Sequence, residues 1–313
     1  MAQTVLVQVI ILSLMILLGF ILGKIGFIKK SHSDFMTDLV MDVFFPCNIL
    51  AAAGNGLGDE QNGMKIALFI IVFYFVMLVV FTVLGYILGG LAGFSEDQRR
   101  AFACSAGYPN NGFMGIPLCS AVFGTRGVLW SSFGVPGATF YIFAVLAPLF
   151  QRSRSENMKE RLRSLLTPLN ISVVIMILML ISGWKLDGPL LSALKSMGAC
   201  NTPAAMLLIG YLLSASPILD TLRRPAVYLV TLCRNLIFPL LCALLLSLTA
   251  LNREMCLCIT MQIGCSVGAT VSTFATRYDR APEFSSESML QSTLLLPLTM
   301  PVMMFLAEKI LTQ

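Results

Sequence analysis

The sequence predicts an all-α polytopic membrane protein that crosses the bilayer ten times. Composition is the first observation: the 313 residues are 57% hydrophobic and 12% charged, whereas soluble domains are about 25% charged. The mean hydropathy of +0.84 agrees. The second observation is that the longest polar interval, Gln151–Thr167, is too short for a soluble domain. The chain is therefore read as a series of membrane spans.

A span needs about 20 mostly apolar residues, and ten such segments follow one another. The first has no basic region before it and no small-residue cleavage site, which favours a retained span over a signal peptide. The sixth is short. The predicted spans are Thr4–Phe27, Asp34–Gly54, Met64–Gly90, Arg100–Phe123, Val128–Phe150, Pro168–Trp184, Pro189–Ser214, Pro225–Leu248, Met255–Arg277 and Ser288–Leu306.

Interruptions occur in corresponding spans of the two halves. The second has Pro46-Cys47-Asn48, and the seventh has Asn201-Thr202-Pro203. The fourth is broken at Pro109, and the ninth contains the glycine-rich run Gly264–Thr270. Spans 2 and 7, and spans 4 and 9, have matching positions in the two halves of the chain. Interrupted spans in matching positions indicate a transporter binding site.

The interruption in the fourth span gives the clearest chemical signal. Pro109 has no backbone N–H and clashes with the preceding turn, so a regular helix should open near Gly107–Asn111. The amides of Asn110 and Asn111 offer hydrogen bonds there, and the N-termini of half-helices attract anions. We therefore expect half of a solute site here, although helix capping also explains the two asparagines.

The basic residues predict the orientation. The alternate loops that begin after the first span contain fourteen Lys and Arg residues, and the opposite side contains six. Because basic loops stay inside, the first set is predicted to be cytoplasmic and both termini extracytoplasmic. The basic connection at 151–167 separates a first five-helix repeat, 1–150, from a second, 168–313. An odd number of spans in each repeat makes the two repeats inverted.

Two ionisable residues lie deep within spans. Arg234 is nine residues beyond Pro225 in the eighth span, and Asp42 is eight residues beyond Asp34 in the second. A charge at such depth costs at least about 2.5–3.5 kcal/mol, so each needs a partner or water. One hypothesis pairs them as an inward gate that the substrate anion opens; the alternative gives Arg234 a structural role elsewhere. Asp42 is also the candidate proton carrier.

Several other classes of protein are excluded or disfavoured. The nine cysteines form no C-x-x-C pair and lie mostly in apolar spans, which is typical of small buried side chains. A single histidine, His32, argues against zinc, and no metal or other cofactor is expected. The sequence has no nucleotide-binding P-loop, no basic patch suited to nucleic acid and no H-E-x-x-H or other catalytic arrangement. We therefore expect no enzyme activity.

Several segments resemble one known family in the right order. They are Pro109–Leu118 in the fourth span, Thr202–Gly210 in the seventh, Phe274–Tyr278 closing the ninth, and Ser292-Thr293 with Pro301 in the tenth. Together they resemble the auxin efflux carrier family, which includes plant PIN proteins and bacterial organic-acid permeases. The resemblance covers nearly the whole chain.

The resemblance implies ten helices in two inverted repeats, with broken helices 4 and 9 crossing near the midplane. Helices 1, 2, 6 and 7 would form a scaffold, through which two copies could dimerise, and helices 3–5 and 8–10 a mobile transport domain. The family places a proline at each crossing, but Ser266 stands at the second. This departure leaves Gly264 and Gly268 to give backbone freedom, or the serine hydroxyl to meet the ligand. The expected substrate-binding residues are Pro109, Asn110, Asn111, Gly112, Gly264, Ser266, Gly268, Thr270 and Gln291.

The predicted function is secondary transport of a small organic anion, such as a mono- or dicarboxylate, across the plasma membrane by alternating access. The energy source is the membrane potential, a proton gradient or the gradient of the substrate itself. The alternative is a sensor or receptor that keeps the fold and binds a small ligand without translocating it.

Overall fold

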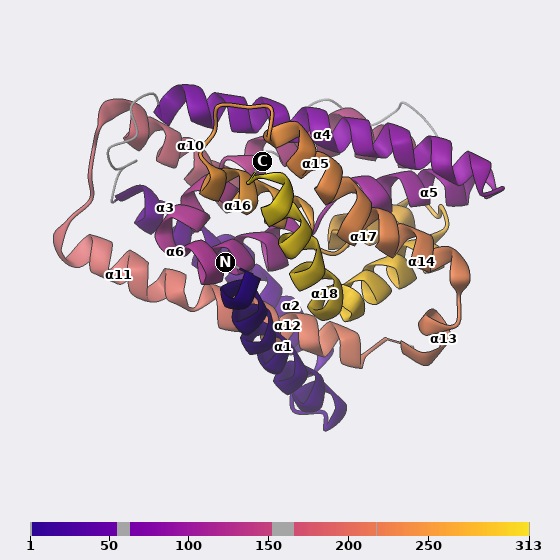
Figure 1. The fold of residues 1–313 in the computed structure, drawn as a ribbon. Coiled ribbons are helices and arrows are strands. Elements are labelled where there is room, and N and C mark those ends of the chain that lie inside the picture. The colour runs from indigo at the N-terminus through magenta and orange to yellow at the C-terminus, as the bar shows by residue number, and fades with distance from the viewer. Residues whose placement is uncertain (1, 55–62, 152–165, 217, 313) are drawn as a thin grey trace.

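The computed structural model describes residues 2–54, 63–151, 166–216 and 218–312, and this part of the chain is helical nearly throughout. Figure 1 shows the helices packed side by side, without a sheet. Among the described residues the only pairing of extended backbone is an isolated antiparallel bridge between Pro109 and Val267. The all-α prediction is confirmed.

Seven helical segments of the described chain are long and apolar enough to cross a membrane, and two shorter apolar helices accompany them. The count is lower than the ten predicted spans because a break divides the ninth into two short helices, and because the fifth and sixth are themselves short; the fourth is represented by Asn111–Ser132, which begins after Pro109. The seven are Val5–Lys24, Lys30–Gly54, Gly63–Leu91, Asn111–Ser132, Gly188–Ser214, Pro225–Leu246 and Pro282–Ile310; the shorter two are Gly134–Phe150 and Pro168–Ser182. The protein is a polytopic all-α membrane protein.

The elements of the first half are α1 (Ala2–Lys24), α2 (Lys30–Leu39), η1 (Val40–Phe44), α3 (Phe45–Gly54), α4 (Gly63–Leu91), α5 (Glu96–Gly107), η2 (Asn111–Gly115), α6 (Ile116–Ser132), α7 (Gly134–Tyr141), η3 (Ile142–Leu146) and α8 (Ala147–Phe150). Within α6 the chain turns sharply at Gly124, whose φ of 62° is left-handed. This turn lies between the predicted fourth and fifth spans.

The elements of the second half are α10 (Pro168–Ser182), α11 (Gly188–Ala199), α12 (Asn201–Ser214), α13 (Ile218–Leu222), α14 (Pro225–Leu232), η4 (Cys233–Ile237), α15 (Phe238–Leu246), α16 (Arg253–Ile263), α17 (Ala269–Arg277) and α18 (Pro282–Ile310). The predicted interruption of the seventh span is a short one, at Cys200 between α11 and α12.

Prolines explain the four π-helical segments. Each ends two residues before a proline: η1 before Pro46, η2 before Pro117, η3 before Pro148 and η4 before Pro239. A proline has no N–H and collides with the carbonyl four residues earlier. One extra residue in the preceding turn shifts the hydrogen bonds, so that the residue before the proline bonds five residues back, as Phe238 N–H does to the carbonyl of Cys233.

Small residues allow the closest helix contacts. A Cβ at Gly19 of α1 would lie 2.3 Å from the carbonyl oxygen of Leu207 in α12, and one at Gly210 would lie 2.0 Å from that of Ile16. These helices cross in Figure 1, with α1 in indigo. Elsewhere α3 packs on α10 and α11, α4 packs on α5 and α7, and α16 packs on α6 and α15.

Large apolar side chains cover the outside of the bundle. Leu14 of α1, Leu68 of α4 and Ile181 of α10 are each about 60% exposed. Such a surface would be unstable in water and is suited to lipid.

Candidate functional site

The first break, Tyr108–Asn110, separates α5 from η2. Tyr108 is extended (φ −109°, ψ 112°), as expected for the residue before a proline. The side chain of Asn110 then caps the next helix, because its Oδ1 accepts a hydrogen bond from the N–H of Phe113 at 3.3 Å. The helix opening predicted at Pro109 is confirmed.

The second break, Gly264–Gly268, separates α16 from α17 without a proline. The N–H of Val267 donates to the Ser292 hydroxyl at 3.0 Å, which ties the break to α18. Both flanking glycines have negative φ, −77° at Gly264 and −69° at Gly268, which any residue can adopt, so this conformation of the break does not use the left-handed region open to glycine. Close packing requires them instead: a Cβ at Gly268 would lie 2.6 Å from the Tyr108 ring.

The two breaks are joined backbone to backbone. The N–H of Asn110 donates to the carbonyl of Ser266 at 2.8 Å, and the N–H of Gly268 donates to that of Tyr108 at 3.0 Å. Each break therefore satisfies part of the backbone that the other exposes, as low-dielectric surroundings require. The junction also gives the four half-helices that meet there a fixed arrangement.

The carbonyl side of this junction consists of the last carbonyls of α5 and α16. Arg234 of η4 reaches them: one guanidinium nitrogen lies 3.0 Å from the carbonyl oxygen of Ala106 and 2.9 Å from that of Gly107, and the other donates to the carbonyl of Ile263. Arg234 is fully buried, whereas Asp42 is exposed. The ion pair predicted between them is not formed in this structure, because the guanidinium is held by backbone carbonyls.

The amide side of the junction is formed by the first backbone N–H groups of η2 and α17. It faces a cavity of about 450 Å³. Its wall combines both breaks with α7, η3 and α10. The lining residues are Met41, Tyr108, Pro109, Asn110, Asn111, Gly112, Phe113, Ile116, Val135, Ala138, Thr139, Ile142, Phe143, Ala147, Thr167, Leu169, Asn170, Gly268, Ala269, Thr270, Phe274 and Arg277.

Asn111 lines this cavity and carries an unused donor, which is itself buried. Its Oδ1 accepts a hydrogen bond from the Tyr74 hydroxyl, which fixes the orientation of the amide. Its Nδ2 is buried without a partner, and the residue as a whole is 6% exposed. An unsatisfied buried donor costs about 1–3 kcal/mol, so a ligand oxygen at this point would recover free energy that the fold leaves unused.

Helix N-termini add further donors. α17 begins at Ala269 without a side-chain cap, and the N–H groups of Ala269 and Thr270 have no acceptor within their helix. Gly112 is in the equivalent position at the start of η2. All three residues line the cavity, so two helix N-termini, each with partial positive charge, meet at one wall.

The charge of the lining is positive. Arg277 is the one charged residue among the described lining residues, and no Asp or Glu contributes. Arg277 and Thr167 both line the cavity and are exposed, so the cavity reaches the surface at these two residues. On the opposite side of the junction, Arg234 and Gln291 are fully buried. Access to the amide side is thus from the end of the bundle at Thr167 and Arg277.

The structure divides the nine predicted binding residues into two groups. Pro109, Asn110, Asn111, Gly112, Gly268 and Thr270 line the cavity. The other three lie behind its wall: Gly264 packs on Met303, the Ser266 hydroxyl donates to the sulfur of Met114 at 3.1 Å, and Gln291 accepts from Thr231 at 3.2 Å and donates to the carbonyl of Thr221.

Sequence reasoning missed Tyr74 and Tyr108. Tyr74 lies within a uniformly apolar helix, and Tyr108 is hidden next to a proline, so neither stands out by pattern. Proline spacing marks three residues that the sequence did single out. Asp42, Asn111 and Arg234 each lie in a π-helical segment, four to six residues before a proline. Such segments often occur at functional sites.

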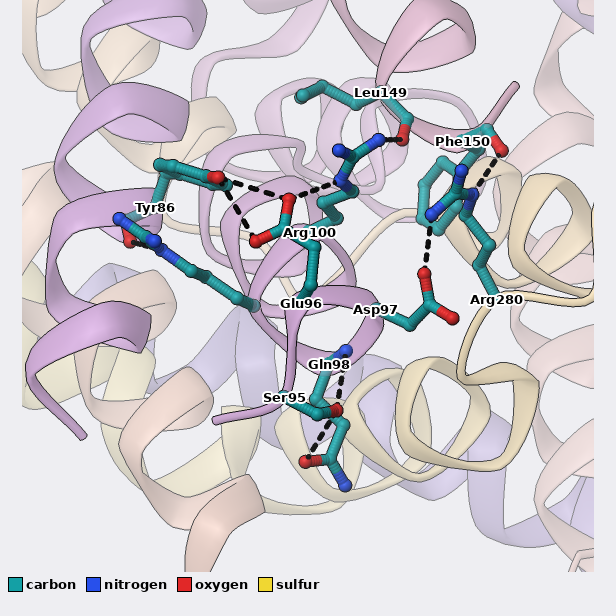
Figure 2. A network of polar contacts seen from close by, with 10 residues as sticks. Tyr86, Ser95, Glu96, Asp97, Gln98, Arg100, Leu149, Phe150 and Arg280 are labelled. Atoms are coloured by element: carbon teal, nitrogen blue, oxygen red, sulfur yellow. Dashed lines mark hydrogen bonds and ion pairs between the residues drawn. The ribbon is translucent and has the colours of Figure 1, made fainter. Parts of the chain in front are cut away.

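A polar network holds the helix ends near the mouth of the cavity (Figure 2). Arg100 donates to the carbonyl of Leu149 at 3.3 Å, and Arg280 donates to that of Phe150 at 2.7 Å, so two arginines cap the end of α8. Arg280 also pairs with Asp97. Glu96 accepts from Arg100 at 2.7 Å and from Tyr86, and the bond from Arg100 lowers the pKa of the Glu96 carboxyl.

Metal chemistry finds no support in the described residues. No group of three His, Cys, Asp or Glu side chains lies close enough to hold an ion. The nine cysteines are free thiols, most of them buried, as expected for small apolar residues.

Comparison with known proteins agrees with these observations. Residues 4–304 match the family described as membrane transport protein, which is nearly the whole chain. The chain belongs to the auxin efflux carrier family. A protein described as an uncharacterized transporter from Methanocaldococcus jannaschii is 21% identical over 216 residues, or 67% of this chain and 68% of that protein. Membership in the auxin efflux carrier family makes the chain a membrane transport protein.

Proposed function

We propose that this protein is a secondary transporter that moves a small organic anion, such as a mono- or dicarboxylate, across the plasma membrane by alternating access. The observation that carries the proposal is the amide side of the junction. Two helix N-termini meet at one cavity, which Asn111 with its unpartnered Nδ2 also lines, and the described part of the lining holds no carboxylate.

The chemistry of this wall favours a carboxylate as the ligand. Neutral N–H donors bind an anion through charge-assisted hydrogen bonds without a second full charge in a low-dielectric setting. The apolar remainder of the wall, including Ile142 and Phe143, suits a carbon skeleton. A volume of about 450 Å³ is within the range of small-molecule sites. Arg277 at the mouth would attract anions.

We infer that the chain forms ten spans as two inverted repeats, 1–150 and 168–313, joined by the basic linker 151–167. The two breaks support this division because each half contributes one, and because the breaks pair in antiparallel fashion. α5 with η2 would be the fourth helix and α16 with α17 the ninth, crossing at the junction. α6 beyond Gly124, with α7, η3 and α8, would be the fifth.

Within this arrangement helices 1, 2, 6 and 7 would be the scaffold and helices 3–5 and 8–10 the transport domain. The packing supports the grouping, since α1 contacts α12 and α3 contacts α10 and α11, while α4, α5 and α14 to α18 pack among themselves. Between the groups lie small voids lined mainly by apolar side chains, including Met114, Met206 and Leu296. Such a surface allows sliding. Dimerisation of two copies through their scaffold helices would keep the scaffold fixed while the transport domain moves.

If the linker side is cytoplasmic, as its basic residues favour, both termini are extracytoplasmic and the cavity opens inward. Asp42 is exposed in η1, near Met41 of the cavity wall. It therefore remains the candidate for proton coupling, with titration of the substrate itself as the alternative.

Counterflow in reconstituted vesicles tests the proposal. Vesicles loaded with an unlabelled dicarboxylate should accumulate the labelled compound from outside, and vesicles with Asn111→Ala protein should not. A purified protein that is stabilised by the carboxylate but gives no counterflow would identify a non-transporting sensor. Neither stabilisation nor counterflow by any mono- or dicarboxylate would contradict the anion site itself.

A further inference from the structure

We propose that Arg234 is a built-in cation, which fills the carbonyl side of the junction so that the protein needs no bound monovalent cation there. The residue is the meeting point of two helix ends that are far apart in sequence. One guanidinium nitrogen contacts the carbonyl oxygens of Ala106 and Gly107 at 3.0 and 2.9 Å, and the other contacts that of Ile263.

These carbonyls are a cation site by their position. They belong to the last turns of α5 and α16, where backbone carbonyls have no partner within the helix. Each helix C-terminus also has about half a negative charge, so two of them side by side attract one positive charge. Half-helix C-terminal ends and unwound carbonyls are what coordinate coupling ions in transporters with broken helices.

No carboxylate competes for the guanidinium. Among the described residues Arg234 forms no ion pair, and its hydrogen-bond acceptors are the three backbone carbonyls. Arg234 is fully buried, and a charge without compensation would be expensive at this depth. The helix ends therefore supply its compensation. The guanidinium in turn neutralises the helix ends, so that no mobile cation is needed there. Its bulk also prevents such a cation from reaching the same carbonyls.

The consequence for transport rests on the proposed function. A site permanently filled by Arg234 cannot load and release Na⁺ or K⁺, so the transport cycle should not depend on either ion. The binding claim itself does not depend on transport, because it concerns the folded protein alone.

Thermal unfolding of the purified protein with defined salts tests the proposal. Replacing NaCl by KCl or choline chloride at equal ionic strength should leave the Tm of the wild type unchanged. Arg234→Ala should lower the Tm by on the order of 10 °C. Guanidinium at millimolar concentration should then raise the Tm of this variant saturably. The wild type should not respond, and neither should the control Arg253→Ala, whose exposed side chain pairs with Glu308.

Three results would overturn the proposal: a Na⁺- or K⁺-specific rise in the wild-type Tm, an unchanged Tm in Arg234→Ala, or a variant that guanidinium does not rescue. If Arg234→Ala yields no folded protein, Arg234→Lys and Arg234→Met replace it. The charged variant should fold and the neutral one should be far less stable; equal yields and Tm values would refute the built-in cation. Counterflow measured in NaCl and in choline chloride separates this claim from transport, since failed transport with a guanidinium-rescued variant would contradict only the proposed function.

Discussion

The carbonyl side and the amide side of the junction are built from the same two broken helices but end differently. On the carbonyl side, the backbone acceptors are buried and bound by Arg234. On the amide side, Ala269, Thr270 and Asn111 line a cavity, and the Nδ2 of Asn111 has no partner. We propose that the protein supplies its own cation for one side and leaves the other for an anion. In this proposal, breaking the two helices creates two sites of opposite polarity, of which one is permanently filled.

The largest effect on both sides of the junction is expected when the two helix breaks are forced apart. Gly268→Ala places a methyl 2.6 Å from the Tyr108 ring and 2.9 Å from the carbonyl oxygen of Pro109. Overpacking of this kind costs about 1–3 kcal/mol, and the backbone bridge must shift, so carboxylate binding should be lost together with stability. Unfolding of the purified variant measures this. Gly112→Ala is the control for stability, since its nearest new contact is an ordinary 3.5 Å to Met41; an equal loss of stability in the control would contradict the packing argument.

Removing the unused donor should affect binding and spare the fold. Asn111→Ala deletes a hydrogen bond to a charged ligand, which is worth about 1.5–3 kcal/mol, so carboxylate affinity should fall about 10- to 150-fold. Titration followed by thermal shift measures it. Asn201→Ala is the matched control, because Asn201 is a fully buried asparagine whose side-chain atoms also lack partners, but it lies outside the cavity. A similar loss of affinity in both variants would show that Asn111 acts through the fold.

A smaller loss of carboxylate affinity is expected when the side-chain amide of Asn111 stays in place but loses the hydrogen bond that orients it. Tyr74→Phe removes the hydroxyl that holds the Asn111 Oδ1, and a hydrogen bond of this kind contributes about 0.5–1.5 kcal/mol. Carboxylate affinity should fall by roughly tenfold or less. Tyr86→Phe, which removes a hydroxyl bonded to Glu96 at the surface, should leave affinity unchanged. Full affinity in Tyr74→Phe would mean that the orientation of Asn111 does not matter.

The smallest effect should come from Asp42. Its side chain is exposed and does not pair with Arg234, so Asp42→Asn should change the free energy of unfolding by no more than about 0.5 kcal/mol. A strong loss of stability, with rescue by exchange of the charges at positions 42 and 234, would revive the gate. If Asp42 carries the coupled proton, the variant should instead lose the pH dependence of counterflow while keeping carboxylate binding.

The sequence was sufficient to predict where the two helices break and about half of the residues of the site. Pro109 lacks an N–H and cannot continue a helix, whatever surrounds it, and Asn110 and Asn111 follow directly. Spacing along the chain could not reveal the partner of Arg234, because the carbonyls that bind it lie 29 and 127 or more positions away. Which side chain reaches which helix end depends on packing between helices, and local patterns do not encode it. Ser266 shows the same limit: its hydroxyl meets Met114 and not the cavity.

The central claim is that the amide side binds a negatively charged carboxylate. Its most direct test is a thermal-shift comparison of mono- and dicarboxylates with their uncharged amide counterparts, on the wild type and on Asn111→Ala. At least one carboxylate should raise the wild-type Tm in a saturable manner, its amide should not, and the rise should be strongly reduced in the variant. Equal stabilisation by the amide, or a full response in Asn111→Ala, would contradict the account.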